Sequence, residues 1–451
     1  MTSRRATEAI AEFIVALDLS AIPDGVLHEA KRSLVDHLAV TLAGAGEPAS
    51  RRLRRVAQRL APTTQATIVG SAERTSAPFA ALLNGYSAHV LDFDDTYNPG
   101  RTTIHGSASV WPVIFALSDL SRLSGRRAVE SFVAGFETQA RVASAAGPAH
   151  YEIGWHVTGT AGHVGAAAAA AKVLELPADA TVHALGCAAT QAAGLKELYG
   201  SDCKALHPGK AAMDGVLSGF LADEGFTAVA TSLEGRQGLL SVMSTDPEPK
   251  LLVDGLNATW HLADNGYKPY PSGSLTHPTV DALLALQERF DFSAREVAGV
   301  DVRVHTYAAT VTGNRSPTTG NQAKFSLVHC AAMALLRRRL TLAEFEDAVV
   351  NDADVARTRD KVSVAVDPSQ GKRSAAVTVT LQDGRRLDGS VLDNRGTPAN
   401  PLRDVDLEQK FLAVAVPKLG EGAARSLMEQ CWRLEQVDDL AAVVAVSAGV
   451  A

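Results

Sequence analysis

The chain has 451 residues, of which 46% are hydrophobic and 5% aromatic, and its formal net charge is −7. This negative charge argues against a general binder of nucleic acid or of membrane surfaces, because both depend on positive protein charge. The length allows two or three domains, and abundant alanine with few aromatics favours packed helices over a β-sandwich. The four cysteines lie far apart with no CxxC, which fits neither zinc nor disulfides and indicates a reducing, cytoplasmic location.

The N-terminal part of the chain shows a helical pattern as far as about Val110, broken near 20–24 and 44–49. Its first residues carry charges through an apolar stretch, which indicates an amphipathic helix and not a signal peptide. A short strand is expected at Thr67–Gly70, and no uncharged run is long enough to span a bilayer.

The stretch Asn84–Pro112, NGYSAHVLDFDDTYNPGRTTIHGSASVWP, concentrates acids and imidazoles. A helix is predicted over Ala77–Asp95, and its side chains three and four residues apart should share one face. Buried carboxylates are costly unless they are paired, so the alternative is a helix end with solvated acids. The side chains expected on this face are His89, Asp92, Asp95 and Thr96.

A turn at Asn98–Gly100 ends this predicted helix. We expect Arg101 and His105 to lie in the polar loop that follows, and the next helix to begin near Pro112. His105 is therefore a candidate acid–base residue on a loop beside the helix-end acids.

Small residues dominate the middle of the chain. Helices are expected over 111–123, 128–145 and 180–193, and a helix through six alanines from Thr158 to Lys172 should lie at the centre of a bundle. His156 precedes that helix. His163 is interpreted as a satisfied polar residue at the start of a buried helix.

Gly194–Gly209, GLKELYGSDCKALHPG, is expected to be a loop, with a helix over 211–224. A helix that starts after Pro208-Gly209 would offer free N–H groups to an anion. Lys204, His207 and Lys210 then form a candidate cation cluster. The alternative is an exposed basic loop.

The pattern changes near Asp264 and becomes that of an α+β module. We predict one helical domain from 1–266 and 397–451, and an inserted α+β domain over 267–396. The segments expected in the inserted domain are strands at 300–312, 362–366, 376–381 and 386–392, with helices at 324–337 and 342–350.

The acid and base candidates are mostly able to carry positive charge, which suits a substrate with two or three carboxylates. They also suit proton abstraction beside a carboxylate, where cations stabilise the enediolate. Metal ligation is the rival reading, but the spacing shows no HExxH, no facial triad and no cysteine pair. The candidates are Asp92, Asp95, His105, His156, Lys204, His207, Lys210, Lys268 and His277.

Five motifs in order resemble the MmgE/PrpD family: LDFDDT with a downstream His, GWHVTGTAGHVGAAAAAAKVL, SDCKALHPGKAAMDGVLSGFLADEGFTA, KPYPSGSLTHPTVDA and AKFSL. The resemblance spans nearly the whole chain. It implies a large helical domain built from both chain ends, a smaller inserted α+β domain, a homodimer, and catalysis without a cofactor.

The resemblance also implies the residues of the site. These are Asp92, Thr96, His105, His156, Lys204 and Lys268. We assign His105 and His156 to proton transfer, Lys204 and Lys268 to the substrate carboxylates, and Asp92 to orienting a neighbouring imidazole or lysine. The remaining substrate-binding candidates are Thr96, Arg101, His207, Lys210 and His277.

Two departures from the family pattern bear on the reaction. A few more residues separate DFDDT from His105, and Gly273 stands where the decarboxylase pattern has a second histidine. The chain also lacks the FPAE-like segment of the family's dehydratases, so the departures favour neither of these two reactions. The first expectation is a dehydratase of a hydroxylated di- or tricarboxylate. The alternatives are an epimerase of an iminodisuccinate-like compound, a decarboxylase of a cis-aconitate-like acid, and a non-catalytic binding protein on the same scaffold.

Overall fold

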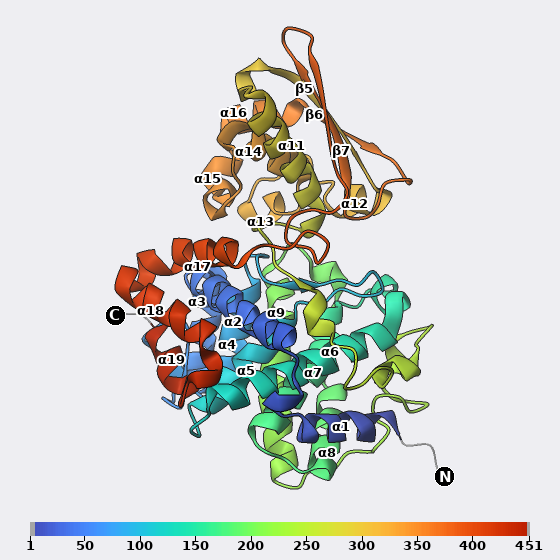
Figure 1. Ribbon diagram of the computed structural model, residues 1–451, viewed down its shortest axis with the longest axis vertical. Coiled ribbons are helices and arrows are strands. Elements are labelled where there is room, and N and C mark those ends of the chain that lie inside the picture. The colour runs from blue at the N-terminus through green and yellow to red at the C-terminus, as the bar shows by residue number, and fades with distance from the viewer. Residues whose placement is uncertain (1–4, 449–451) are drawn as a thin grey trace. The chain divides into compact units, whose positions relative to one another are not determined.

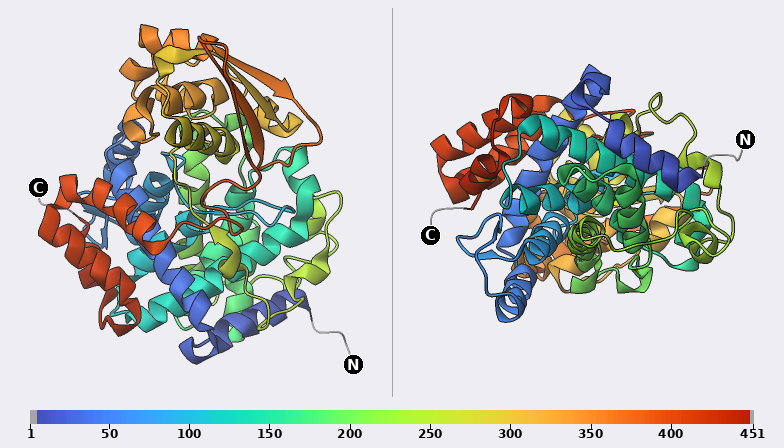
Figure 2. Two further views of the ribbon diagram at one scale, coloured as in Figure 1. Left: turned by 45° about the horizontal axis from the view of Figure 1, so that its top comes forward. Right: turned by 90° about the horizontal axis from the view of Figure 1, so that it is seen from below.

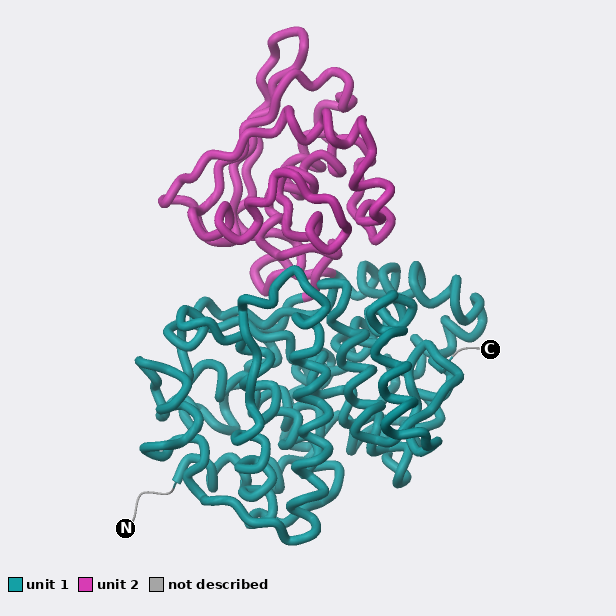
Figure 3. Tube along the Cα trace, turned by 180° about the vertical axis from the view of Figure 1, so that it is seen from behind, with its two compact units in different colours: residues 1–266, 403–451 teal, residues 267–402 magenta. Residues whose placement is uncertain are grey.

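The computed structural model describes residues 5–448, which form two compact units (Figure 3). The first unit contains the chain up to Gly266 together with the segment that begins at Arg403, and the second unit spans Tyr267–Leu402. The structure confirms a mainly helical fold with a small mixed sheet in the C-terminal region. Among the described helices, none combines the length and apolar character needed to cross a membrane.

The first unit is helical apart from two short strand pairs, β1 (Ala66–Thr67) with β2 (Arg74–Thr75) and β3 (Thr96–Tyr97) with β4 (Asn265–Gly266). Its helices are labelled in Figure 1. Their bounds are α1 Ala6–Ala16, α2 Asp24–Ala45, α3 Pro48–Leu60, α4 Ala77–His89, α5 Gly106–Ser118, α6 Gly125–Ile153, α7 Val157–Val173, α8 Ala178–Ala189, α9 Asp202–Asp223, α10 Leu239–Met243, α17 Asp404–Leu419, α18 Glu421–Trp432 and α19 Leu440–Val446.

Helix α7 lies at the centre of the first unit, as its run of alanines predicts, and every one of its residues is buried. Its neighbours approach closely because the contact residues are small. A Cβ added to Gly165 would lie 2.7 Å from the Gly135 carbonyl oxygen of α6, and one added to Gly215 of α9 would lie 2.4 Å from Ala166 Cβ. This packing holds the N-terminal end of α7, where His156 lies, between α6 and α9.

The C-terminal helices belong to the first unit and pack on its N-terminal part. Helix α17 lies beside α2 (Figures 1 and 2), and Lys410 Nζ donates hydrogen bonds to Asp36 Oδ1 and to the Phe93 carbonyl oxygen, both at 2.7 Å. Burial raises the pKa of Asp36, and the Lys410 cation opposes that rise. Lys410 of the C-terminal segment thus holds both α2, through Asp36, and the acidic stretch, through the Phe93 backbone.

The second unit packs helices against a four-stranded sheet of order β6-β5-β7-β8. Strands β5 and β6 are parallel, and the other two pairings are antiparallel. Inward-facing apolar side chains of the sheet and of α11 and α14 form its core. The elements are α11 His277–Phe290, β5 Val297–Val304, α12 Thr306–Val311, α13 Gly320–Ala323, α14 Leu327–Arg337, α15 Asp347–Val350, α16 Ala353–Asp360, β6 Val362–Val366, β7 Ala375–Leu381 and β8 Arg386–Val391.

Several predicted elements of the second unit have different bounds. The helix expected over 342–350 is divided into a 3₁₀ turn, Leu342–Phe345, and α15. The strand expected over 300–312 ends at Val304, and helix α12 follows because His305 Nδ1 accepts the Tyr307 N–H and starts a turn. The helix expected over 324–337 begins at Leu327, where the Ser326 side chain caps it by accepting the His329 N–H.

Candidate active site

The acidic stretch after α4 is a tight connection and not a continuation of the helix. Helix α4 ends at His89, and Asp92 has a φ of 54°, a left-handed conformation that a right-handed helix cannot contain. The prediction that Asp92, Asp95 and Thr96 share a helix face with His89 is therefore wrong. The connection instead turns these side chains toward several neighbouring helices.

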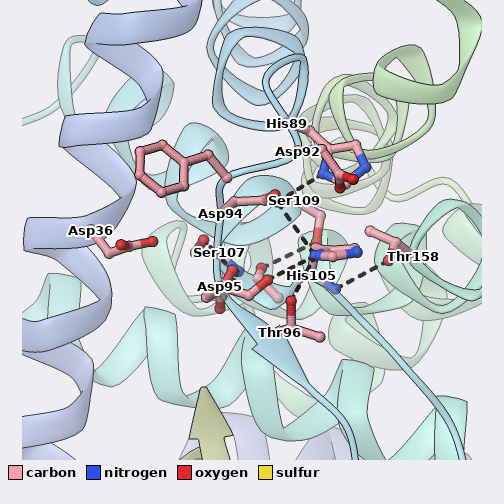
Figure 4. A network of polar contacts seen from close by, with 12 residues as sticks. Asp36, His89, Asp92, Asp94, Asp95, Thr96, His105, Ser107, Ser109 and Thr158 are labelled. Carbon is pink, nitrogen blue, oxygen red and sulfur yellow. Dashed lines mark hydrogen bonds and ion pairs between the residues drawn. The ribbon is translucent and has the colours of Figure 1, made fainter. Parts of the chain in front are cut away.

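The carboxylates of this connection are buried, so the alternative of solvated acids is also wrong. Figure 4 shows Asp94 and Asp95 close to His105 and Ser107. Asp94 Oδ2 lies 2.8 Å from His89 Nδ1. Asp95 accepts hydrogen bonds from Ser107 Oγ at 2.6 Å and from Asn265 Nδ2 at 2.9 Å. Burial, together with the neighbouring charge of Asp94, raises the pKa of Asp95 to about 7.

His105 lies at the N-cap position of α5, which begins at Gly106 and so starts earlier than predicted. Its side chain is buried and its Nδ1–H donates to the Asp95 carbonyl oxygen at 2.7 Å. Asp94 Oδ2 lies 3.6 Å from the same nitrogen, and the His105 backbone N–H donates to Thr158 Oγ1 at 3.1 Å. Because a carbonyl oxygen only accepts, Nδ1 carries a proton, which leaves Nε2 as the nitrogen that can take part in proton transfer.

His156 lies at the N-cap position of α7 and its side chain is buried. Its Nδ1 is 2.8 Å from His207 Nδ1. Burial lowers the pKa of His156 well below its ordinary value, and the charges of His89 and Lys204 lower it further. Burial likewise lowers the pKa of His207 to about 4, so both rings are neutral at neutral pH.

Four imidazoles thus lie together, three at the ends of helices α4, α5 and α7 and the fourth within α9. The ring centroids of His89 and His105 are 4.6 Å apart, those of His89 and His156 5.8 Å, and those of His105 and His156 6.4 Å. His207 completes the group, 5.1 Å from His156. We call His89, His105, His156 and His207 the histidine cluster.

Lys204 reaches the cluster from α9. This helix begins at Asp202, where the Ser201 side chain caps it, so Lys204 and His207 lie on a helix and the predicted loop over 194–209 is wrong in its second half. No helix starts after Gly209, which removes the anion site predicted there. Lys204 Nζ donates to Asp92 Oδ1 at 2.9 Å.

Lys210 and Arg101 are tied to carboxylates elsewhere in the first unit. Lys210 pairs with Asp214 one turn further along α9, and Asp214 Oδ2 is 3.0 Å from His163 Nε2. Arg101 Nη2 lies 2.6 Å from Glu248 Oε1. Both cations therefore have carboxylate partners outside the histidine cluster.

The remaining two candidates belong to the second unit. Lys268 is buried, with 4% of its surface exposed. His277 is the first residue of α11, and its Nε2 lies 3.2 Å from the Ser272 carbonyl oxygen.

His89 and Asp94 are functional candidates that lie outside the set of site residues predicted from the sequence. Asp94 contacts both His89 and His105, and His89 Nε2 is a buried nitrogen for which no hydrogen-bond partner lies among the described residues. The motif LDFDDT contains Asp94, so the motif could have identified this residue. Helical spacing from His89 does not include it.

The arrangement is suited to moving protons near an anion. Neutral imidazoles can accept a proton, and Lys204 supplies a positive charge beside them for a substrate carboxylate. One nitrogen from each of His89, His105 and His156 also lies within 4.8 Å of the other two, so the same rings could hold a metal ion.

Two models of known protein families together match nearly the whole chain. Residues 8–252 match the MmgE/PrpD N-terminal domain, and residues 270–434 match the MmgE/PrpD C-terminal domain. Both matches agree with the resemblance inferred from the five motifs.

Three curated relatives are similar to this chain over 76–100% of its length. Cis-aconitate decarboxylase of Mus musculus is 27% identical over 97% of this chain and 92% of its own length. The Homo sapiens cis-aconitate decarboxylase is 26% identical over 100% of this chain and 96% of its own length. A cis-aconitate decarboxylase of Aspergillus terreus is 28% identical over 76% of this chain and 74% of its own length.

Proposed function

The chain belongs to the MmgE/PrpD family, and we propose that it is a cofactor-independent lyase that acts on a small tricarboxylate by proton transfer at carbon. The observation that carries this proposal is the histidine cluster, in which buried neutral imidazoles lie beside the Lys204–Asp92 ion pair. Such a group combines bases with a cation for a carboxylate, which is the set that chemistry beside a carboxylate requires.

Decarboxylation of a cis-aconitate-like acid is the first reaction to test. The curated relatives named above carry this activity in their names, and this chain spans at least 74% of the length of each of those three. In this reaction the bond between carbon and the leaving carboxylate breaks, and its electron pair moves into the remaining unsaturated acid. The carbon then takes up one proton, which an imidazole relays from water, and CO2 leaves.

Dehydration, the first expectation from the sequence, is the second candidate. Neutral imidazoles favour it, because its first step removes a proton from the carbon beside a carboxylate. A hydroxyl group must then leave with a proton from a second acid. Epimerisation shares the first step but returns a proton to the opposite face, with no leaving group.

In the proposed site, His105 and His156 transfer protons and Lys204 binds a substrate carboxylate. Asp92 orients Lys204, and Thr96 Oγ1 lies 3.4 Å from His105 Nδ1, where it helps to orient that ring. Lys268 and His277 stay candidates on the family motifs alone, as does the homodimer. The cytoplasmic location stays a prediction from the cysteine pattern.

Proton NMR in D2O tests the proposal on the purified chain with cis-aconitate, a hydroxylated tricarboxylate and iminodisuccinate. Release of CO2 with a product that has one carboxylate fewer supports decarboxylation. A new vinyl signal without CO2 supports dehydration. Exchange of the α-proton without elimination supports the epimerase. Binding of these acids without any turnover or exchange would contradict the lyase proposal.

A further inference from the structure

Three rings of the histidine cluster converge on one point. His89 comes from the end of α4, His105 from the N-cap position of α5, and His156 from the N-cap position of α7. All three are at least 92% buried, and one nitrogen from each lies within 4.8 Å of the other two. The sequence spacing gives no sign of this, because the rings come from segments that only the fold brings together.

Each of these rings is held from outside through Nδ1. His89 Nδ1 contacts Asp94 Oδ2 at 2.8 Å, His105 Nδ1 contacts the Asp95 carbonyl oxygen at 2.7 Å, and His156 Nδ1 contacts His207 at 2.8 Å. Metal-binding histidines are oriented in this way, with one ring nitrogen bound to a carboxylate, a carbonyl or another polar group and the other nitrogen on the metal.

His89 provides an independent indication of a ligand. Its Nε2 is buried and has no hydrogen-bond partner among the described residues. A buried polar atom without a partner costs free energy that a bound ligand would recover. Because Nδ1–H donates to Asp94, Nε2 carries a lone pair, which an electron-pair acceptor can use.

We propose that His89, His105 and His156 form a binding site for a divalent transition metal ion of the Zn²⁺ class. Imidazole nitrogens suit Zn²⁺, whereas Mg²⁺ and Ca²⁺ prefer oxygen ligands. Zinc–nitrogen bonds of about 2.0–2.1 Å in tetrahedral geometry place the nitrogens about 3.4 Å apart. The rings therefore need to draw together slightly, and a fourth position on the metal stays open.

The charges around the three rings are compatible with a cation. Asp94 lies against His89 and is 3.6 Å from His105 Nδ1, so its carboxylate can balance part of the metal charge. Lys204, which approaches the rings from α9, is paired with Asp92.

The consequence is reversible inhibition. His105 and His156 are the proton-transfer residues of the proposed function, and this step of the inference rests on that function. A metal that occupies their lone pairs removes both bases, so metal and substrate compete for the enzyme. The site thereby makes a cofactor-independent lyase sensitive to free transition metal.

Metal binding is tested first on the tag-free full chain by calorimetry with Zn²⁺ and by visible absorption with Co²⁺. We expect one ion per chain, and an affinity at least tenfold weaker in His89→Gln. The matched control is His28→Gln, because His28 is an exposed imidazole that stacks on Trp432. Unchanged affinity in a folded His89→Gln chain, or no saturable binding by the wild type, would overturn the proposal.

X-ray absorption on the Zn²⁺-loaded wild type makes the result independent of how the variant folds. Three imidazole ligands are expected, and fewer than three would contradict the site. Inhibition is then measured with and without EDTA at several substrate concentrations. Zn²⁺ that occupies the site without slowing turnover would overturn the competition. A chain without lyase activity would refute the proposed function and leave the binding measurements valid.

Discussion

His105 is the residue whose loss should affect the reaction most directly. Its ring is buried and its Nδ1–H is held by the Asp95 carbonyl oxygen, so Nε2 keeps one fixed orientation. We expect His105→Ala to lower kcat by about 10²–10⁴-fold, the range for the loss of a general acid–base group. Steady-state kinetics with the substrate found by NMR measures the effect.

The control for this variant is His28→Ala, which removes an exposed histidine of α2 that pairs with Asp404. It should leave kcat unchanged. Circular dichroism checks that His105→Ala is folded. A folded His105→Ala chain with activity within a few-fold of the wild type would exclude His105 from proton transfer.

At the residue scale, the sequence motifs select His105, His156, Lys204 and Asp92, and the fold brings these four side chains into one region. Periodicity could not identify Asp94. The left-handed conformation of Asp92 breaks the helical course of the chain, and Asp92 also contacts a lysine 112 residues away. Local patterns contain no information about such a contact.

At the element scale, close helix crossings set the distances within the site. Gly85 of α4 faces both α5 and α9, and a Cβ there would lie 2.7 Å from the Ala108 carbonyl oxygen and 2.9 Å from Gly209 Cα. Both neighbours are backbone atoms and cannot rotate away. We expect Gly85→Ala to lower the free energy of unfolding by about 1–3 kcal/mol through overpacking.

Gly422→Ala is the matched control, because α18 leaves its Cβ position open with no atom within 4 Å. The better helix propensity of alanine should make this variant equal to the wild type or up to about 1 kcal/mol more stable. Urea unfolding of both variants tests the comparison. Equal stabilities of the two variants would show that α4, α5 and α9 can accommodate an added methyl group at Gly85 without overpacking.

The same crossing explains why the start of α9 differs from the prediction. Pro208 and Gly209 have the pattern of a break before a new helix, yet α9 runs through both. Gly209 serves the approach to α4, since a Cβ there would lie 2.5 Å from the Leu82 carbonyl oxygen. A glycine that is needed for close helix packing cannot be distinguished by sequence alone from a glycine that ends a helix.

At the scale of the whole molecule, Glu137 should link stability to pH. Its Oε1 accepts the Leu262 N–H at 2.9 Å, whereas Oε2 has no hydrogen-bond partner among the described residues and the Arg141 Nε is 3.9 Å away. Burial raises the pKa of Glu137 to about 7. The folded chain therefore holds a proton that the unfolded chain releases between the ordinary glutamate pKa of 4.5 and about 7.

Stability should consequently fall as pH rises through this window, by about 3 kcal/mol for a carboxyl group shifted this far. Glu137→Gln keeps the acceptor for Leu262 but cannot ionise. We expect its midpoint of unfolding to change less than that of the wild type between pH 5 and pH 8. This interval covers most of the pH range between the glutamate pKa of 4.5 in the unfolded chain and about 7 in the folded chain. Parallel curves for the two chains would show that Glu137 does not titrate in this range.

Catalysis should not need a metal. The proposed proton transfers use imidazoles and a lysine of the chain itself, so we expect activity to survive dialysis against EDTA. A rise in activity on chelation would fit the inhibitory site. Loss of activity that one divalent metal restores would contradict the cofactor-independent mechanism.

Composition and periodicity are sufficient to predict a mainly helical chain with a mixed sheet near its C-terminal end. Alanine-rich segments have no bulky side chains for a sheet to bury, and the β-branched run at Val300–Val304 has no helical period. Helix ends are predicted less well, because caps such as Ser201 and Ser326 act through single hydrogen bonds that many other serines could also make.

The discontinuous first unit has a consequence for biosynthesis. The second unit, Tyr267–Leu402, is one continuous stretch that is fully synthesised before α17. The first unit cannot complete its fold until α17 has been synthesised. Until Lys410 is synthesised, Asp36 lacks an ion partner that lies 374 residues downstream. The nascent chain must keep this part of α2 soluble while more than three hundred residues are added, so chains that terminate early expose it and become clients of chaperones and proteases.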